Sequence, residues 1–190
     1  KEVENIFTTE QDRDLWRLIM GCLRNKDPGA MLEWYRRHPG TPYMYQMSLT
    51  EGDVVIEGGV FDGSNSREFS RQIGKTGRVY GFDPNGDDFI RARERHGMPP
   101  ENVEIIRKAI WSSSKKIYVQ KIGAGTRVSE IKNESVDEIV AISIDDFVAE
   151  RNLRRLDLVK MDVEGAEQAA LAGGMASIQQ LRPQLAISIY

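Results

Sequence analysis

Glycines and acidic side chains stand close together in one short segment, VVIEGGVFDGS, at residues 54–64. Glycine lets the backbone turn sharply and lets a ligand approach it closely. If Ser64 caps a helix that follows, the first N–H groups of that helix face an anion. The carboxylates of Glu57 and Asp62 attract positive charge instead. The segment therefore predicts a ligand that carries positive charge together with a carboxylate. Its candidate contacts are Glu57, Gly58, Gly59, Phe61, Asp62, Gly63 and Ser64.

Two kinds of cofactor are candidates for this segment. A dinucleotide site has the spacing G-x-G-x-x-G, whereas the glycines here are spaced G-G-x-x-x-G. Glu57 and Asp62 would also repel a pyrophosphate. S-Adenosylmethionine suits the segment better, because its ammonium and sulfonium match the acids and its carboxylate matches the helix N–H groups. The alternative is that the glycines only turn the chain and that the acids are solvated loop charges.

A further acidic residue ends the second apolar segment, VYGFDP. Asp83 at this strand tip is expected to accept both ribose hydroxyls of the cofactor, and Pro84 fixes the chain as it leaves the strand. A simple Asx turn before proline is the alternative for Asp83. In the segment RKAIW, Ala109 and Ile110 are expected to offer backbone and an apolar surface to adenine. Trp111 is either a further stacking partner or a core residue.

Transfer of a methyl group from S-adenosylmethionine requires the methyl group and the acceptor atom to lie in line at about 3 Å, and an acceptor that carries a proton has to lose it. The segment LVKMDVEGAE supplies the candidate catalytic residues, Asp162 and Lys160. Asp162 ends the fourth strand on the cofactor side, and Lys160 on the same face could pair with it or orient the acceptor. The alternative is that Asp162, like Glu164 and Glu167, only caps the next helix. We predict no metal site, because two acids without a histidine make a poor one.

Short apolar segments alternate with amphipathic ones along most of the chain. Strands are expected at residues 54–56, 79–82, 103–110, 156–161 and 185–190, and helices at 64–73, 87–96 and 164–172. This alternation predicts an α/β domain with an open, doubly wound and mostly parallel sheet of the Rossmann-like kind. Residues 111–137 break the pattern and are expected to form an inserted β-hairpin or lid, with GAG near its bend. A strand IVAIS and a helix from Ile144 follow.

The composition limits the partners of the chain. It has 190 residues and a net charge of −3, with basic and acidic residues mixed along it. This mixture gives no footprint for nucleic acid or an anionic membrane, and no apolar run approaches the ~18 residues of a membrane span. The single cysteine, Cys22, is expected to be an idle thiol in a reducing compartment, which favours the cytoplasm. His38 and His96 are expected at the surface or at helix ends.

Taken in order, these motifs resemble the FkbM-family methyltransferases over residues 52–190. The pieces that carry the likeness are VVIEGGVFDGS, GFDP, SIDDF, DLVKMDVEGAEQAALAGG and RPQLAISIY. The resemblance implies a class I, S-adenosylmethionine-dependent enzyme that O-methylates hydroxyls of sugars or polyketide-type metabolites. It places Glu57, Gly58, Gly59 and Gly63 in the cofactor loop and Asp83 at the ribose. Glu57 departs from the aspartate common in such loops, and family members continue past the last strand, so a truncated C-terminal part is expected.

Three functions follow from these patterns. The first is an O-methyltransferase of a small molecule or glycan, the second a nicotinamide-dependent oxidoreductase, and the third a nucleotide-binding module without turnover. The division of the chain is expected to be residues 1–48 as an N-terminal helical extension and residues 49–190 as the cofactor-binding domain. The extension, with helices at 9–23 and 29–37, is expected to cover the site or to form a homodimer contact.

Overall fold

The computed structural model describes residues 10–37, 47–85, 90, 93–94, 96–122, 125–129 and 137–188. The chain divides into two compact units, residues 1–46 and residues 47–190. The first unit contains the two helices α1 (Glu10–Asn25) and α2 (Gly29–Arg37), which contact each other. The Asp27 carboxylate accepts a hydrogen bond from the N–H of Gly29, 2.9 Å away, and so caps the start of α2. Both helices were predicted from the apolar pattern, and both are confirmed.

The second unit is built on a five-stranded sheet in the order β3-β2-β1-β8-β9, and every neighbouring pair in it is parallel. Its strands are β1 (Val54–Gly58), β2 (Arg78–Phe82), β3 (Val103–Ile106), β8 (Leu158–Met161) and β9 (Gln184–Ile187). The two central strands, β1 and β8, are almost wholly buried. A strand covered on both faces needs near-continuous apolar residues, which is why these segments were recognisable in the sequence.

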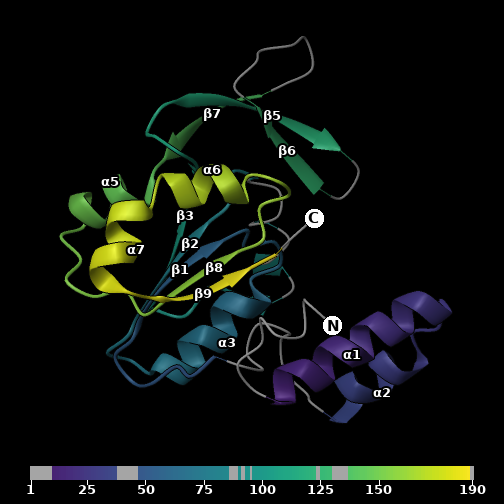
Figure 1. The fold of residues 1–190 in the computed structure, drawn as a ribbon. Coiled ribbons are helices and arrows are strands. Elements are labelled where there is room, and N and C mark those ends of the chain that lie inside the picture. Colours follow the sequence, from purple (N-terminus) through teal and green to yellow (C-terminus); the bar gives the residue numbers. More distant parts are fainter. Residues whose placement is uncertain are drawn as a thin grey trace. The chain divides into compact units, whose positions relative to one another are not determined.

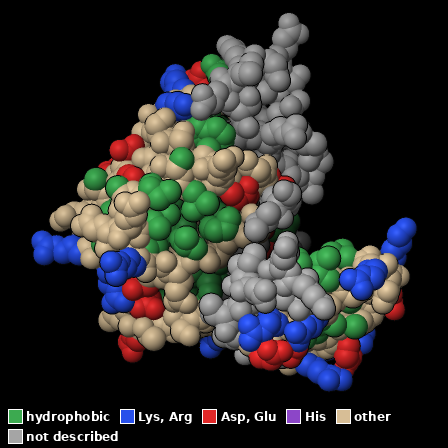
Figure 2. Space-filling view, viewed as in Figure 1, with side chains coloured by type: hydrophobic (Ala, Val, Ile, Leu, Met, Phe, Trp, Pro, Cys, Tyr) green, Lys and Arg blue, Asp and Glu red, His purple; other side chains and the backbone are tan. Residues whose placement is uncertain are grey.

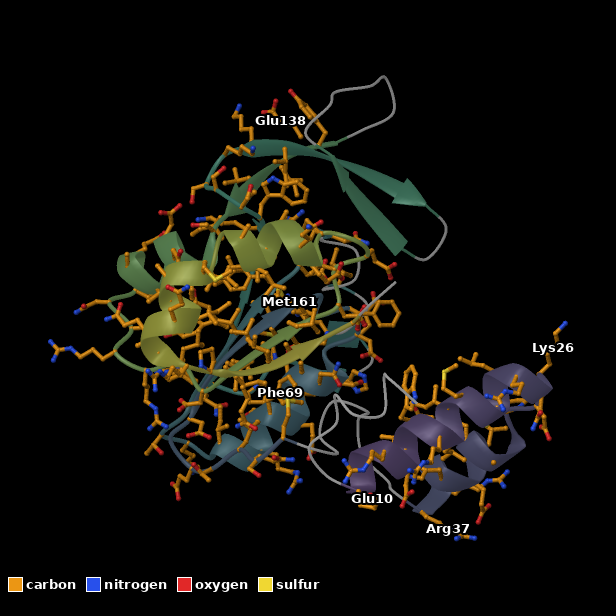
Figure 3. All side chains as sticks on the ribbon, in the orientation of Figure 1. Glu10, Lys26, Arg37, Phe69, Glu138 and Met161 are labelled. Carbon is orange, nitrogen blue, oxygen red and sulfur yellow. The ribbon has the colours of Figure 1, made fainter. Side chains whose placement is uncertain are left out.

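Helices cover both faces of this sheet, as Figure 1 shows. On one face lies α3 (Ser64–Ile73), and on the other lie α5 (Ile144–Glu150), α6 (Glu167–Ala172) and α7 (Met175–Leu181). Two fully buried side chains mark the two apolar layers, Phe69 on α3 and Met161 on β8 (Figure 3). Met161 packs in one cluster with Phe147 of α5 and Ala170 of α6. The doubly wound architecture predicted from the sequence is therefore confirmed.

A second sheet holds the inserted segment, in the order β4-β7-β5-β6. Its strands are β4 (Ala109–Ile110), β5 (Lys116–Ile122), β6 (Gly125–Ser129) and β7 (Asp137–Ile142). Strands β5 and β6 pair antiparallel with Ile122 opposite Gly125, which confirms the predicted hairpin and the place of its bend. Strand β7 and helix α5 follow, also as predicted.

The single strand predicted at residues 103–110 is wrong. The chain leaves the first sheet after Ile106, whose carbonyl accepts hydrogen bonds from the N–H groups of both Asp83 and Lys108. Ala109 and Ile110 then pair with β7 in the second sheet. The apolar run is continuous in sequence, but its two halves belong to different sheets.

Other boundaries shift from their predicted places. Helix α6 begins at Glu167 rather than at residue 164, because Glu164 and Gly165 have positive φ angles of 55° and 95° that no α-helix accommodates. Most of the helix predicted at residues 87–96 lies outside the described residues, although residues 90, 93–94 and 96 are helical. His38 and the last two residues of the strand predicted at 185–190 also lie outside them.

In the part of the chain that the structure describes, no helix combines the length and the apolar character needed to cross a membrane.

Burial falls toward the edge strand β9, whose first two residues are exposed. Figure 2 shows hydrophobic side chains on the face that carries α7 and β9, the elements of the exposed Met175 and Leu185. The best-buried part of the sheet is thus its centre, at β1 and β8.

Candidate functional site

The connectivity of the sheet reverses between β1 and β8. From β1 the chain adds β2 and β3 on one side, and later adds β8 and β9 on the other. In open sheets of this kind, ligands bind outside the carboxyl ends of the strands at such a reversal. The glycine segment follows β1 at that end, and Asp162 follows β8 directly. Two of the segments singled out in the sequence therefore meet at one place.

The turn after β1 is held by neighbours on both sides. Gly59 has a φ of +79°, and a Cβ atom built on it would lie only 2.0 Å from the carbonyl oxygen of Asp162. Its N–H donates to the carbonyl of Phe82 at 2.9 Å, and the N–H of Asp162 donates to the carbonyl of Gly58 at 3.0 Å. Only glycine fits this combination of backbone angle and close approach. The turn therefore contacts the ends of both β2 and β8.

Asp83 lies at the tip of β2 and grips the same turn. Its Oδ2 accepts hydrogen bonds from the N–H groups of Val60 and Phe61, at 3.1 and 3.0 Å. Its Oδ1 accepts from the N–H of Asn85 at 2.8 Å, which forms the Asx turn considered as an alternative. The carboxylate is half-buried rather than enclosed, and an ionised carboxylate offers about four acceptor positions. Three backbone donors therefore fix the orientation of this carboxylate at the tip of β2.

The start of α3 differs from the prediction. Its N-cap is Gly63, with a φ of 74° and no side-chain cap, so the expected capping role of Ser64 is wrong. Asp62 takes that role instead, because its Oδ1 accepts from the N–H of Ser64 at 3.1 Å. The Asp62 Oδ2 lies 3.9 Å from Nε2 of His96. Both the first helix N–H and the Asp62 carboxylate thus have partners within the protein.

Glu57 is not the loop carboxylate that the sequence suggested. It is the fourth residue of β1, it has no exposed surface, and its Oε2 accepts a short hydrogen bond from the Ser66 hydroxyl. Burial raises its pKa to about 7, against the opposing effects of Lys160 and Ser66, and the nearby Asp83 charge raises it further. A direct contact of Glu57 with a ligand is therefore excluded in this conformation.

Lys160 is also more deeply buried than expected. Its side chain is 2% exposed, and its Nζ lies 3.7 Å from Oε1 of Glu57. Nζ donates to the carbonyl of Gly59 at 2.8 Å and approaches that of Gly58 at 3.4 Å. The expectation that Lys160 orients the acceptor by contact is wrong, because the ammonium lies beneath the glycine turn.

The prediction that residues 109–110 offer an apolar surface to adenine is also wrong. Ala109 and Ile110 are 4% and 3% exposed, and each belongs to an apolar core cluster. Their side chains are used in packing β4 against neighbouring elements and present no apolar surface to a ligand. Trp111 is half-buried and packs against the cluster of Ala109, as a core residue does. Pro84 is half-buried beside Asp83 at the tip of β2.

Asp162 remains a candidate for chemistry because of its place. It is half-buried at the carboxyl end of β8, and its backbone packs directly against Gly59. Helix α6 has its N-cap at Ala166 and no side-chain cap there, and Oε1 of Glu167 accepts from the N–H of Val163, before the helix, at 2.8 Å. His96 ends a helical stretch, as predicted, since Gly97 is no longer helical. Within the described ranges, no three His, Cys, Asp or Glu residues are grouped as metal ligands would be.

Sequence reasoning missed Ser66 as part of this region. It is 2% exposed on α3 and joins Glu57 from the helix side. A serine in the apolar stripe of an amphipathic helix was the available signal, since a buried hydroxyl needs a partner. The partner itself could not be named from the sequence.

The chain matches the family model of the methyltransferase FkbM domain over residues 55–190. It is 26% identical to the 2-O-methyltransferase NoeI of Sinorhizobium fredii over 152 residues, which cover 68% of this chain and 60% of that protein. It is 31% identical over 104 residues to the hexuronic acid methyltransferase AglP of Haloferax volcanii, covering 54% of this chain and 44% of that protein. The chain thus spans 60% of the length of the first relative and 44% of the length of the second.

The fold is similar to that of a solved structure, methyltransferase FkbM from Methylobacillus flagellatus. The TM-score is 0.66 at 16% sequence identity, and the match covers 98% of this chain and 46% of the other. This likeness concerns the fold alone. The family model covers well over half of the chain, and it includes the glycine turn, Asp83 and Asp162. The chain belongs to the FkbM methyltransferase domain family.

Proposed function

We propose that this domain is part of an S-adenosylmethionine-dependent O-methyltransferase that acts on a hydroxyl of a sugar or another small molecule. The observation that carries the proposal is the meeting of the glycine turn, Asp83 and Asp162 at the point where the sheet reverses. Family membership supplies the class of reaction. A nicotinamide site gains no support, because the glycines are spaced G-G-x-x-x-G rather than G-x-G-x-x-G and no described contact favours a pyrophosphate.

The residues present fit the proposed cofactor. Asp83 offers a half-exposed carboxylate held rigidly by backbone N–H groups, and a ribose diol needs such an acceptor. The exposed Phe61 lies beside it on the turn, with a φ of 50°. At Gly59 the turn carries no side chain where it approaches the carbonyl of Asp162 at the tip of β8. We assign the ribose to Asp83 and the remainder of the cofactor to the edge formed by the turn and Asp162.

The chemistry of the proposed reaction places modest demands on the protein. When bound, S-adenosylmethionine supplies a methyl group that is already activated by its sulfonium. The protein has to orient the acceptor hydroxyl, exclude water and accept a proton. Asp162 is the residue that we assign to the proton, at its carboxylate oxygens, because it follows β8 at the reversal point. Lys160 has no such role, since its ammonium is buried beneath the turn.

The acceptor class is proposed from the relatives. NoeI is named a 2-O-methyltransferase and AglP a hexuronic acid methyltransferase, so the first name describes methylation at an oxygen and the second methylation of a sugar acid. We therefore propose a sugar hydroxyl as the first acceptor to test. A cytoplasmic location and a homodimer remain predictions.

A ligand-binding assay tests the cofactor, and an activity assay tests the reaction. S-Adenosylhomocysteine should raise the melting temperature of the chain, whereas NAD and NADP should not, because a ligand that binds only the native state stabilises it. Incubation with S-adenosylmethionine and a panel of sugars, including a hexuronic acid, should add one methyl group detectable by mass spectrometry. A shift with the dinucleotides alone would contradict the cofactor, and cofactor binding without methylation of any acceptor would favour a binding module.

A further inference from the structure

A buried glutamate–lysine pair lies directly beneath the glycine turn. Glu57 and Lys160 are direct neighbours in the register of β1 and β8, and both are almost completely inaccessible. Their charged atoms are 3.7 Å apart. Glu57 Oε1 is the one buried side-chain oxygen, among the described residues, without a hydrogen-bond partner. Burying an ammonium and a carboxylate is costly in free energy, so a pair in this place calls for a reason.

The ammonium makes its closest contact with the turn itself. Lys160 Nζ lies 2.8 Å from the carbonyl oxygen of Gly59, which is nearer than its distance to Glu57. That carbonyl belongs to the peptide group between Gly59 and Val60. The N–H of the same peptide group donates to Oδ2 of Asp83 at 3.1 Å. One rigid peptide plane is therefore held at its oxygen by Lys160 and at its nitrogen by Asp83.

Through this peptide group, the buried Lys160 fixes the orientation of the N–H that Asp83 accepts at the tip of β2. A peptide group is planar, so fixing its carbonyl also fixes the direction of its N–H. An ammonium on the carbonyl also polarises the group and strengthens the hydrogen bond that its N–H donates. Gly59 has no side chain and a φ of +79°, so the chain by itself holds this plane only weakly. The lysine supplies the constraint that the glycine lacks.

We propose that Lys160 is a positioning residue for Asp83: its buried ammonium fixes the Gly59–Val60 peptide, and this peptide fixes the carboxylate that receives the cofactor's ribose. Glu57 faces the ammonium from the neighbouring strand at 3.7 Å, and Ser66 holds Glu57. The inference rests on the proposed function in one respect only, the ribose. The effect of Lys160 on the geometry of the turn is independent of any cofactor.

The test replaces both buried charges together, as Glu57→Gln/Lys160→Met. Replacing both residues removes the whole pair at once, and exchanges of this kind are often neutral for stability. The matched control is Glu138→Gln/Lys116→Met, which removes an exposed Glu–Lys pair with a separation of 2.6 Å on strands β5 and β7. Each protein is measured for its unfolding midpoint, its affinity for S-adenosylhomocysteine by calorimetry and its amide hydrogen exchange.

The buried double variant should keep its unfolding midpoint while exchange at Val60 and Phe61 becomes roughly 10- to 100-fold faster, the range for a lost hydrogen bond from a charged donor. Exchange at Ile56, within β1, should not change. Affinity for S-adenosylhomocysteine should fall by roughly the same factor. In an Asp83→Ala background the double replacement should cause no further loss of affinity, because the two changes act through one contact. The control pair should match the parent throughout.

Parent-like exchange at Val60 and Phe61 would overturn the proposal, as would additive losses of affinity in the Asp83→Ala background. A double variant that fails to fold would also overturn it, by showing that the pair serves the whole fold rather than the turn. If the parent itself does not bind S-adenosylhomocysteine, the proposed function fails. The exchange measurement then still decides whether Lys160 holds the turn.

Discussion

Replacing Glu57 by glutamine removes a carboxylate that has no exposed surface while keeping its size and its hydrogen-bonding oxygen. Burial raises the pKa of this group from its ordinary value of 4.5 to about 7, since the desolvation of its charge outweighs the attraction of Lys160 and the hydrogen bond from Ser66. The repulsion by Asp83 acts in the same direction as burial. The folded protein therefore holds a proton that the unfolded chain releases.

The direction of this linkage sets the expected pH dependence. Below pH 4.5 the Glu57 carboxyl is protonated in both the folded and the unfolded state, so the stability does not change with pH. Between pH 4.5 and about 7 the folded protein keeps this proton while the unfolded chain has released it. The stability contributed by the neutral carboxyl therefore falls as the pH rises through this window. Each unit of difference between the folded and unfolded pKa corresponds to about 1.4 kcal/mol, so the free energy of unfolding falls by roughly 3 kcal/mol across the whole window.

The assay is urea unfolding of the parent and of Glu57→Gln between pH 5 and 8. The parent should lose stability relative to the variant by about 2 to 3 kcal/mol over this range. Near pH 5 the two should be similar, because a protonated glutamate and a glutamine are close in shape and charge. The control Glu138→Gln removes an exposed carboxylate and should follow the parent at every pH.

A variant that is less stable than the parent at pH 8 would refute this reasoning. It would mean that the pairing with Lys160 outweighs the cost of burial, so that Glu57 is ionised in the folded protein at all neutral pH values. Parallel pH profiles of parent and variant would show that its pKa is not raised at all.

Three further changes test the site. Gly59→Ala should lower the free energy of unfolding by more than Gly165→Ala, because both positions have positive φ but only Gly59 has an atom, the Asp162 carbonyl oxygen, within 2.0 Å of the new Cβ. The left-handed backbone alone costs about 1–3 kcal/mol, so equal losses in chemical denaturation would show that the turn relaxes. Asp83→Ala should weaken binding of S-adenosylhomocysteine by at least about tenfold in calorimetry, and unchanged affinity would place the ribose elsewhere. Asp162→Asn should reduce methyl transfer by roughly 10²–10⁴ with cofactor affinity changed only a few-fold, and a variant with the parent's rate would exclude Asp162 as the base.

Local sequence determined the elements on which the site is built. The apolar run before Gly58, the glycines after it and the amphipathic helix from Ser64 are visible within twenty residues, and β1, the turn and α3 form there. Strand tips in a doubly wound sheet converge at one edge, so the neighbourhood of the glycine turn, Asp83 and Asp162 also followed from the order of the elements. The family resemblance came from the same local motifs.

Only the tertiary structure decided how those side chains are used. Glu57 and Lys160 are 103 residues apart in sequence and become neighbours through the register of β1 and β8, so neither their burial nor their pairing can be deduced from either segment. Asp62 rather than Ser64 accepts a hydrogen bond at the start of α3, where Gly63 has a φ of 74°. Ile106 and Ala109 pair with strands of two different sheets. Hydrophobic periodicity reports which face of an element is covered, whereas partners across elements depend on long-range packing that local patterns do not contain.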